Sequence, residues 1–173
     1  MITYQIDYNL NILFVGSNPH PGSYRRGVPF SNNKMFWYLL HDAGLISETR
    51  EVLRDDSKLK DLYLHVFKDH YKFGLYDVVH RPTRTIAEVE KSEAQKGSQR
   101  LLEVIQKYQP RVVCFVSKAT YGLFSGSLKT SYGWQSDIGT SKAYMMHAPH
   151  RGFASVRIEE LREIKNFIEN FKK

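Results

Sequence analysis

Residues 12–37 read ILFVGSNPHPGSYRRGVPFSNNKMFW, and this stretch predicts the fold of the chain. The apolar run 12–15 is short, partly β-branched and aromatic, which is typical of a buried strand. It ends at the sequence GSNP (16–19), whose residues favour a sharp turn. In an open α/β sheet, ligands bind beyond the carboxyl ends of the strands. The turn therefore predicts a functional position for Asn18.

Strands and helices alternate along the rest of the chain. Hydrophobic spacing and turn residues predict strands at 75–79, 112–116 and 143–146, and helices at 34–43, 57–72, 92–108, 118–125 and 156–171. We expect Gly44 to end the first helix and Ser155 to cap the last one. Strand 112–116 is wholly apolar and is expected to be central and parallel. The alternation predicts a three-layer α/β/α sandwich with a short, mainly parallel central sheet.

The composition is that of an ordinary globular chain. It has 173 residues with 42% hydrophobic residues, no internal repeat and no linker, so we expect a single domain over residues 1–173. The longest apolar runs are far shorter than the roughly 20 residues that cross a membrane. The first nine residues do not resemble a signal peptide. We therefore expect a cytoplasmic, nucleoid-associated protein without a membrane partner.

The formal net charge of +7 favours a polyanionic partner. Basic residues lie in three loops that follow predicted strands, so one edge of the sheet is expected to carry them; they are Arg25, Arg26, Lys34, Arg81, Arg84 and Arg151. The last helix mixes acidic and basic residues, which is typical of a solvated face.

Histidine and cysteine do not indicate a metal or a cofactor. Cys114 is the single cysteine, which excludes an internal disulfide and a cysteine-based zinc site, and its apolar surroundings favour a buried thiol. His65 and His70 are five residues apart on a predicted helix, which does not place them on one face. His147 and His150 have no acidic partner at ligand spacing.

Four segments, in order along the chain, resemble those of the mismatch-specific uracil/thymine-DNA glycosylases of the uracil-DNA glycosylase superfamily. The segments are GSNP (16–19) with GVPF (27–30) and FW (36–37), YDVVHRPT (76–83), YQP (108–110) with KATY (118–121), and APHRG (148–152) after the last strand. The resemblance implies the α/β/α fold and a monomer. It also implies hydrolysis of the N-glycosidic bond of a mismatched or damaged pyrimidine, flipped out of double-stranded DNA into a pocket.

The resemblance also implies roles for individual residues. Asn18 is the residue that positions the attacking water; an amide holds water but is a very poor base, which suits a dissociative path. Phe30 stacks on the flipped pyrimidine, and the backbone amides of Ser17 and Phe30 hydrogen-bond the edge of the base. Gly16 and Ser17 are both expected to be substrate-binding residues. Ser23 lies near the pyrimidine C5 position, where a small residue leaves room for the methyl group of thymine.

The last segment is implied to enter the minor groove and fill the space left by the flipped base. Arg151 and Phe153 are the alternative wedge residues, and Arg151 is also a candidate phosphate contact. The DNA-binding positions expected in full are Arg25, Arg26, Lys34, Arg81, Lys118, His150, Arg151, Gly152 and Phe153.

The chain departs from the family pattern in the last segment. Other branches place a histidine or asparagine before the proline, where it hydrogen-bonds the uracil oxygen; here the residue is Ala148, and His147 lies one position earlier. An aspartate that activates water is absent from 16–19. An active glycosylase for G·U, with G·T as a further substrate, is the first hypothesis. A non-catalytic protein that binds mismatches or abasic sites is the alternative, and a nucleoside hydrolase is a third, which the basic loops disfavour.

Overall fold

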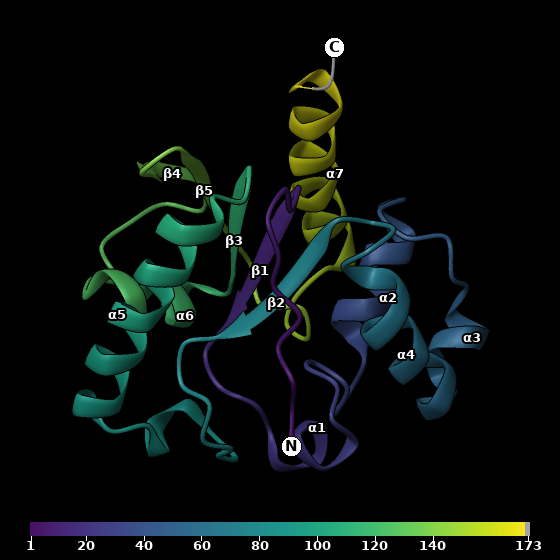
Figure 1. Cartoon of the computed structure of the whole chain (residues 1–173), viewed down its shortest axis with the longest axis horizontal. Coiled ribbons are helices and arrows are strands. Elements are labelled where there is room, and N and C mark those ends of the chain that lie inside the picture. Colours follow the sequence, from purple (N-terminus) through teal and green to yellow (C-terminus); the bar gives the residue numbers. More distant parts are fainter. Residues whose placement is uncertain (172–173) are drawn as a thin grey trace.

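The computed structural model describes residues 1–171. A five-stranded sheet with the order β2-β1-β3-β5-β4 lies at its centre (Figure 1). The strands are β1 (Ile12–Gly16), β2 (Phe73–Asp77), β3 (Val112–Val116), β4 (Gly133–Ile138) and β5 (Ser141–Met146). β1, β2, β3 and β5 pair in parallel, and β4 pairs antiparallel with β5 at the edge. The predicted mainly parallel sheet, with 112–116 in the middle, is confirmed.

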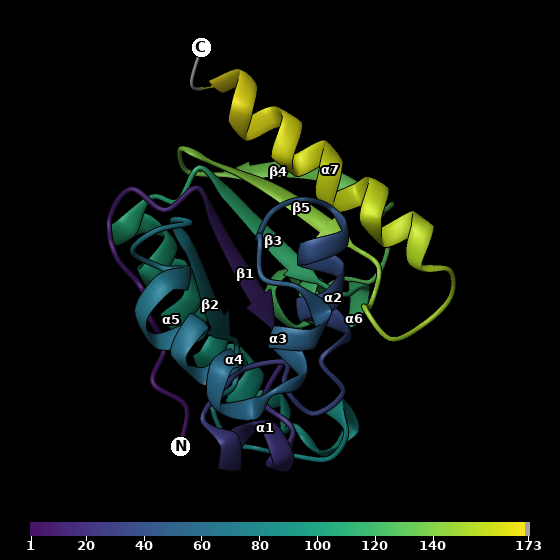
Figure 2. The same cartoon turned by 90° about the vertical axis from the view of Figure 1, so that its right-hand side faces the viewer.

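Helices cover both faces of this sheet. Phe14 and Cys114 face a core that includes α2 (Met35–Asp42), α4 (Asp56–Leu62) and α7 (Ala154–Phe171). Val15 and Phe115 face the opposite core, against α5 (Lys91–Tyr108) and α6 (Lys118–Ser125). Figure 2 shows α2, α3 and α4 on the near side of the strands with α7 running across the end beside β5. The three-layer α/β/α architecture predicted from the sequence is therefore confirmed.

Two predicted elements have different bounds in the structure. The helix predicted at 57–72 is α4 followed by a π-helical turn, η1 (Tyr63–Phe67), and α3 (Arg50–Arg54) precedes it. The side chain of Asp55 accepts a hydrogen bond from Lys58 N and starts α4. The strand predicted at 75–79 is shifted two residues earlier, because Val78 and Val79 lie beyond the ladder and donate to the carbonyls of Gly16 and Ser17 at 2.9 Å.

The predicted end of the helix at 34–43 and the predicted start of the helix at 156–171 have different outcomes. The last helix begins at Ala154, so Ser155 lies inside it and the prediction of Ser155 as its N-cap is wrong. Gly44 follows α2 with φ +77°, the left-handed conformation that glycine adopts after a helix.

Four elements have no counterpart in the sequence prediction. They are α1 (Pro21–Arg26), α3, the 3₁₀ turn η2 (Ile86–Glu88) and β4. The sequence of β4, GWQSDI, contains no apolar run because this edge strand is largely solvent-facing. α1 begins at Pro21, and the ring of His20 accepts a hydrogen bond from Gly22 N at 3.0 Å.

Two kinds of feature are absent from residues 1–171. No helix in this range is long and apolar enough to cross a membrane. The same residues contain no group of three or more His, Cys, Asp or Glu side chains arranged to hold a metal ion.

Candidate active site

A cavity of about 750 Å³ lies where the parallel strands end. This volume is in the range of small-ligand sites. Its wall comes from the segments after β1, β2, β3 and β5, because the carboxyl ends of parallel strands meet at one edge of a sheet. Of the residues expected at a site, it brings together Ser17, Asn18, Ser23, Phe30, Lys118, His147, Ala148, His150 and Arg151.

Asn18 is held in one orientation by the segment after β2. Its amide nitrogen Nδ2 donates to Thr83 Oγ1 at 2.5 Å and to the Arg81 carbonyl at 3.3 Å. The buried Thr83 hydroxyl donates its own proton to the Thr85 carbonyl at 2.7 Å, so it can only accept from Asn18. Asn18 Oδ1 accepts a hydrogen bond from the Ser17 hydroxyl at 3.4 Å, and its second lone pair is left as an acceptor. This amide is therefore oriented to receive a hydrogen bond from water.

Phe30 stands on a tight turn between α1 and α2. Its backbone is left-handed, with φ +55°, and Ser23 Oγ stabilises the turn by accepting from Ser31 N at 3.1 Å and Asn32 N at 3.0 Å. One face of the Phe30 ring stacks on Phe36, with centroids 4.5 Å apart. The half-buried ring also lines the cavity, so a flat ligand can stack on it. Ser23 shapes this wall through the turn that it supports.

Asp77, the last residue of β2, is a carboxylic acid in the cavity wall. It is 4% exposed, and its Oδ2 accepts a hydrogen bond from the Tyr4 hydroxyl at 2.6 Å. Burial raises the pKa of Asp77 to about 7, although the bond from Tyr4 acts in the opposite direction. A Cβ at position 16 would collide with Asp77 Oδ1 and the tip of Phe30, so only glycine fits there. Gly16 thus lets the acid and the aromatic ring approach each other.

His147 is fixed by α7 and by an aromatic neighbour. Its backbone N–H and its ring nitrogen Nδ1 each lie 3.0 Å from the carboxylate oxygens of Glu160. The imidazole stacks on Tyr132, with ring centroids 3.5 Å apart. Tyr132 belongs to the segment before β4 and also lines the cavity. His147 is therefore in the cavity wall, although its position in the sequence is one residue before that of the family pattern.

A second α7 side chain, Arg157, holds the segment 148–153 that follows. Arg157 is 4% exposed, and it donates from Nε to the Ala148 carbonyl at 2.6 Å and from Nη1 to the Phe153 carbonyl at 2.8 Å. Its guanidinium packs against Gly152, whose φ of +71° suits glycine. Burial lowers the pKa of His150, and the cations Arg151 and Arg157 lower it further. His150 is therefore biased towards the neutral form.

Phe153 and Arg151 project from this segment without cover. Phe153 is 80% exposed, which is unusual for a phenylalanine, and Arg151 is also exposed. Arg151 lines the cavity mouth, whereas Phe153 and Gly152 do not line it. Both projecting side chains are therefore accessible from solvent.

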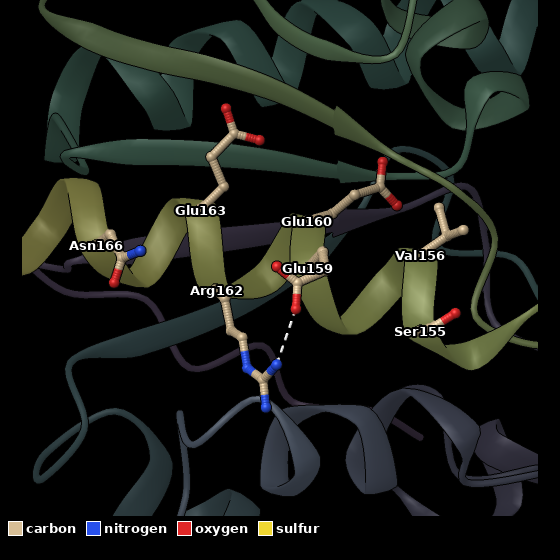
Figure 3. Close-up of a pocket in the computed structure, with 7 residues that line it drawn as sticks. All are labelled: Ser155, Val156, Glu159, Glu160, Arg162, Glu163 and Asn166. Carbon is tan, nitrogen blue, oxygen red and sulfur yellow. Dashed lines mark hydrogen bonds and ion pairs between the residues drawn. The ribbon is translucent and has the colours of Figure 1, made fainter.

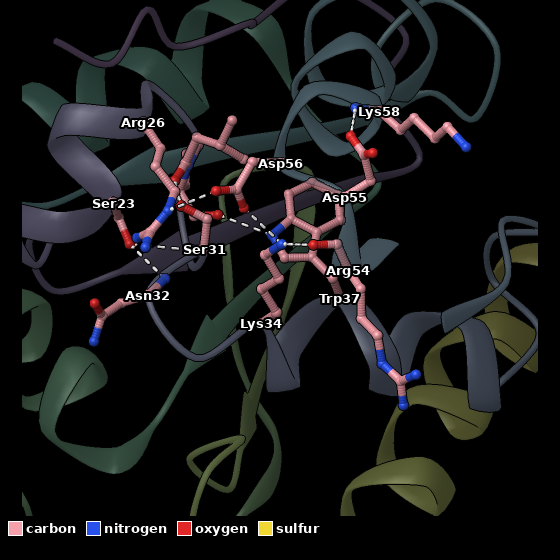
Figure 4. A network of polar contacts seen from close by, with 12 residues as sticks. Ser23, Arg26, Ser31, Asn32, Lys34, Trp37, Arg54, Asp55, Asp56 and Lys58 are labelled. Atoms are coloured by element: carbon pink, nitrogen blue, oxygen red, sulfur yellow. Dashed lines mark hydrogen bonds and ion pairs between the residues drawn. The ribbon is translucent and has the colours of Figure 1, made fainter. Parts of the chain in front are cut away.

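Three of the cations expected to bind DNA are instead engaged in ion pairs. Arg26 and Lys34 both contact Asp56, at 3.3 Å and 2.7 Å, and Lys34 also donates to the Arg54 carbonyl (Figure 4). Arg81 forms two hydrogen bonds to Glu93, which lowers the pKa of that carboxyl to about 2. None of the three lines the cavity, and Arg25 is exposed on α1 outside it.

A second hollow lies along α7 (Figure 3). Glu159, Glu160 and Glu163 give it an acidic wall. All three carboxylates already have partners within the protein: Glu160 holds His147, Glu163 accepts from Tyr144 and Trp134, and Glu159 pairs with Arg162. The acidic side chains of this hollow therefore serve to attach α7 to the sheet and to stabilise the helix surface.

Sequence reasoning did not identify several residues that build the site. They are Thr83, Tyr132, Arg157, Glu160 and Asp77. Only Asp77 leaves a signal in the sequence, as a carboxylate inside an otherwise apolar run, FGLYDVV. The others become visible only when distant segments meet, because nothing local distinguishes them from surface residues.

One comparison with known proteins bears on this geometry. The model of the family described as "Uracil DNA glycosylase superfamily" matches residues 3–171, which is nearly the whole chain.

Proposed function

The chain belongs to the uracil-DNA glycosylase superfamily, whose members are DNA glycosylases, and from this premise we propose the substrate and mechanism of this protein. It removes a mismatched or damaged pyrimidine, uracil opposite guanine first and thymine opposite guanine second, from double-stranded DNA. Water breaks the N-glycosidic bond, so the products are the free base and an abasic site. The chain acts as a monomer with a single catalytic domain and needs no cofactor.

The orientation of Asn18 is the observation that carries this proposal. Because Thr83 and Arg81 occupy both hydrogens of its amide, Oδ1 is available to hold a water molecule at the cavity. An amide oxygen cannot remove a proton from water efficiently, so the sugar must become cationic before water adds to C1′. The bonding electrons leave with the base, which takes up a proton, and the water oxygen becomes the sugar hydroxyl. Positioning and electrostatics then supply most of the rate.

The other contacts suit a flipped nucleotide. The free face of Phe30 provides a stacking surface for a pyrimidine ring, and the base must leave the helix to reach it. Ser23 is small, buried and part of the cavity wall, so a C5 methyl group meets no bulky side chain at this residue. This is the reason for including thymine among the substrates.

The exposed side chains beside the cavity suit the rest of the DNA. Phe153 is the wedge in this proposal, because an exposed aromatic ring compensates stacking lost when a base is flipped out. Arg151, Lys118 and His150 lie at the cavity and face the phosphates or the minor groove. Arg25 extends this surface along α1.

Asn18→Ala is the direct test. We expect base release from a G·U duplex to fall by a factor of about 10² or more, because the water loses its positioning group, while duplex affinity changes little. Base release is measured as strand cleavage by alkali after single-turnover incubation, with G·T, U·A and hypoxanthine duplexes in parallel. Asn166→Ala, on the exposed side of α7, is the matched control and should retain the parental rate.

Two results would contradict the mechanism in different ways. Parental rates in Asn18→Ala would exclude Asn18 as the water-positioning residue. Salt-sensitive duplex binding without release of any base by the parental protein would instead favour the non-catalytic mismatch-binding alternative, which needs no polar side chain at Ala148.

A further inference from the structure

The site described above lacks a side-chain donor for the departing base at the position where related proteins carry one. The side chain of Ala148 has no polar group, and its backbone carbonyl accepts a hydrogen bond from Arg157. When the glycosidic bond breaks, negative charge develops on the base oxygens. A hydrogen-bond donor at such an oxygen stabilises the transition state.

We propose that Asp77, as the neutral carboxylic acid, donates a hydrogen bond to a carbonyl oxygen of the departing base and is a catalytic residue of this glycosylase. This inference rests on the proposed function. It also assigns the substrate class, because a neutral acid donor matches bases that carry a carbonyl oxygen on the edge facing β2. The acid proton stays on Asp77 throughout, so no group is transferred.

The position of Asp77 supports this role. Its carboxyl group lines the cavity that holds Asn18 and Phe30. Oδ1 and the tip of the Phe30 ring both lie against Gly16, so the acid is beside the edge of the ring on which the base stacks. A base stacked on Phe30 extends past that ring edge and brings its own edge groups towards Oδ1. The absence of a side chain at Gly16 is what allows this approach.

The hydrogen bond from Tyr4 determines which oxygen is available. Tyr4 donates to Oδ2 at 2.6 Å, so that oxygen is occupied as an acceptor. No hydrogen bond is formed by Oδ1 with the residues that the structure describes, so Oδ1 carries the donating proton into the cavity. Tyr4 itself remains protonated, because burial and the nearby Asp77 raise its pKa.

The surroundings of Asp77 explain why the acid form exists near neutral pH. Tyr4 from the N-terminal segment, Tyr63 from η1 and Tyr76 of β2 are the titratable groups around it, and all three have raised pKa values and are neutral. His80 packs on Tyr4, and its pKa is lowered by burial and by Arg100, so it also tends to be neutral. The cations of the cavity wall lie on other elements; they are Arg84, Lys118, Arg151 and Arg157. The pKa of Asp77 rises to about 7 because the effect of burial outweighs that of the hydrogen bond from Tyr4.

The sign of the pH dependence follows from this pKa. Below about pH 7 Asp77 is the acid and can donate, whereas above it the carboxylate repels the electron-rich base. We therefore expect single-turnover base release from a G·U duplex to fall as the pH rises through about 7, approaching tenfold per unit above it. Duplex affinity, measured at the same pH values, should not show this decline.

Three substitutions test whether Asp77 acts as a hydrogen-bond donor or has only a structural role. Asp77→Asn keeps a donor at every pH, so its rate should remain nearly constant where the parental rate declines. Asp77→Ala removes the donor and should lower the rate of base release at acid pH by about 10²-fold. The rate of this variant should not fall further as the pH rises through about 7. Tyr4→Phe removes the bond that favours the carboxylate, so its decline should move to higher pH.

The outcomes distinguish this inference from the proposed function. Base release that declines through about pH 7 in the parental protein but not in Asp77→Asn supports the donor role. An identical pH profile in Asp77→Asn and the parental protein, or a parental rate in Asp77→Ala, overturns it while leaving the glycosylase intact. Failure of the parental protein to release any base at any pH overturns both.

Discussion

At the scale of single residues, the orientation of Asn18 depends on a hydrogen bond whose direction is fixed by a neighbouring one. Asn18 and Thr83 are 65 positions apart, yet the Thr83 hydroxyl fixes which end of the Asn18 amide faces the cavity. The direction is unambiguous because the threonine proton is already donated to Thr85. An amide free to rotate would present its NH₂ group to water in part of the population.

Thr83→Val tests this fixation with a side chain of the same shape. Removal of one hydrogen bond of about 1 to 1.5 kcal/mol predicts a roughly tenfold lower rate of base release, with unchanged duplex affinity. Single-turnover kinetics and a duplex titration measure the two quantities. Thr85→Val provides the control, because the Thr85 side chain does not contact Asn18 and only its carbonyl takes part. A tenfold loss in both variants would show that the segment, and not the Thr83 hydroxyl, is responsible.

At the scale of elements, α7 is the support for the segment that meets DNA in our proposal. Two of its charged side chains are buried, which is rare for arginine and glutamate unless their polar atoms are paired. Glu160 holds His147 at the start of the segment, and Arg157 holds the carbonyls of Ala148 and Phe153 across it. The segment is thus organised before any ligand arrives.

Arg157→Ala should therefore both destabilise the protein and loosen this segment. Loss of two hydrogen bonds from a charged group predicts a decrease of about 3 kcal/mol or more in the free energy of unfolding. Urea denaturation measures it, and amide hydrogen exchange of 148–153 should become faster. Arg162→Ala is the matched control on the same helix; its pair with Glu159 is exposed, so we expect a decrease of less than about 1 kcal/mol. Equal decreases in the two variants would contradict the role given to Arg157.

At the scale of the whole molecule, the net charge of +7 matters less than the distribution of unpaired cations. Arg26 and Lys34 share the single carboxylate of Asp56, and Arg81 is paired with Glu93, away from the cavity. Arg151 and Lys118 lie at the cavity and have no carboxylate partner among residues 1–171. The positive field acting on DNA is therefore expected to be strongest around the cavity mouth.

Salt dependence of duplex binding tests this distribution. Each phosphate contact contributes about −0.9 to the slope of log K against log salt concentration. We expect Arg151→Ala to make the slope shallower by about 1, and Arg26→Ala to change it by much less because Asp56 already pairs with that arginine. Fluorescence titration of a labelled duplex at several salt concentrations gives the slopes. A larger change for Arg26→Ala would show that Arg26 contacts a phosphate in spite of its pair with Asp56.

The sequence by itself determined the layered fold and the position of the cavity edge. Strand 112–116 could be placed because a fully buried parallel strand must be apolar throughout, and the turn at 16–19 could be placed because glycine and proline act locally. Edge strand β4 and helix α1 could not be predicted, since a half-exposed strand and a six-residue helix show little hydrophobic periodicity in the sequence.

Only the tertiary structure decided which side chains act together. Three interactions show this: Thr83 orients Asn18, Arg157 holds the segment 148–153, and Tyr4 donates to Asp77. Their members are distant in sequence or carry no local signal. It also showed Arg26, Lys34 and Arg81 in ion pairs, which composition cannot reveal. The physical reason is that hydrophobic pattern and turn preference are local properties, whereas burial, pKa and hydrogen-bond direction depend on what the folded chain brings into contact.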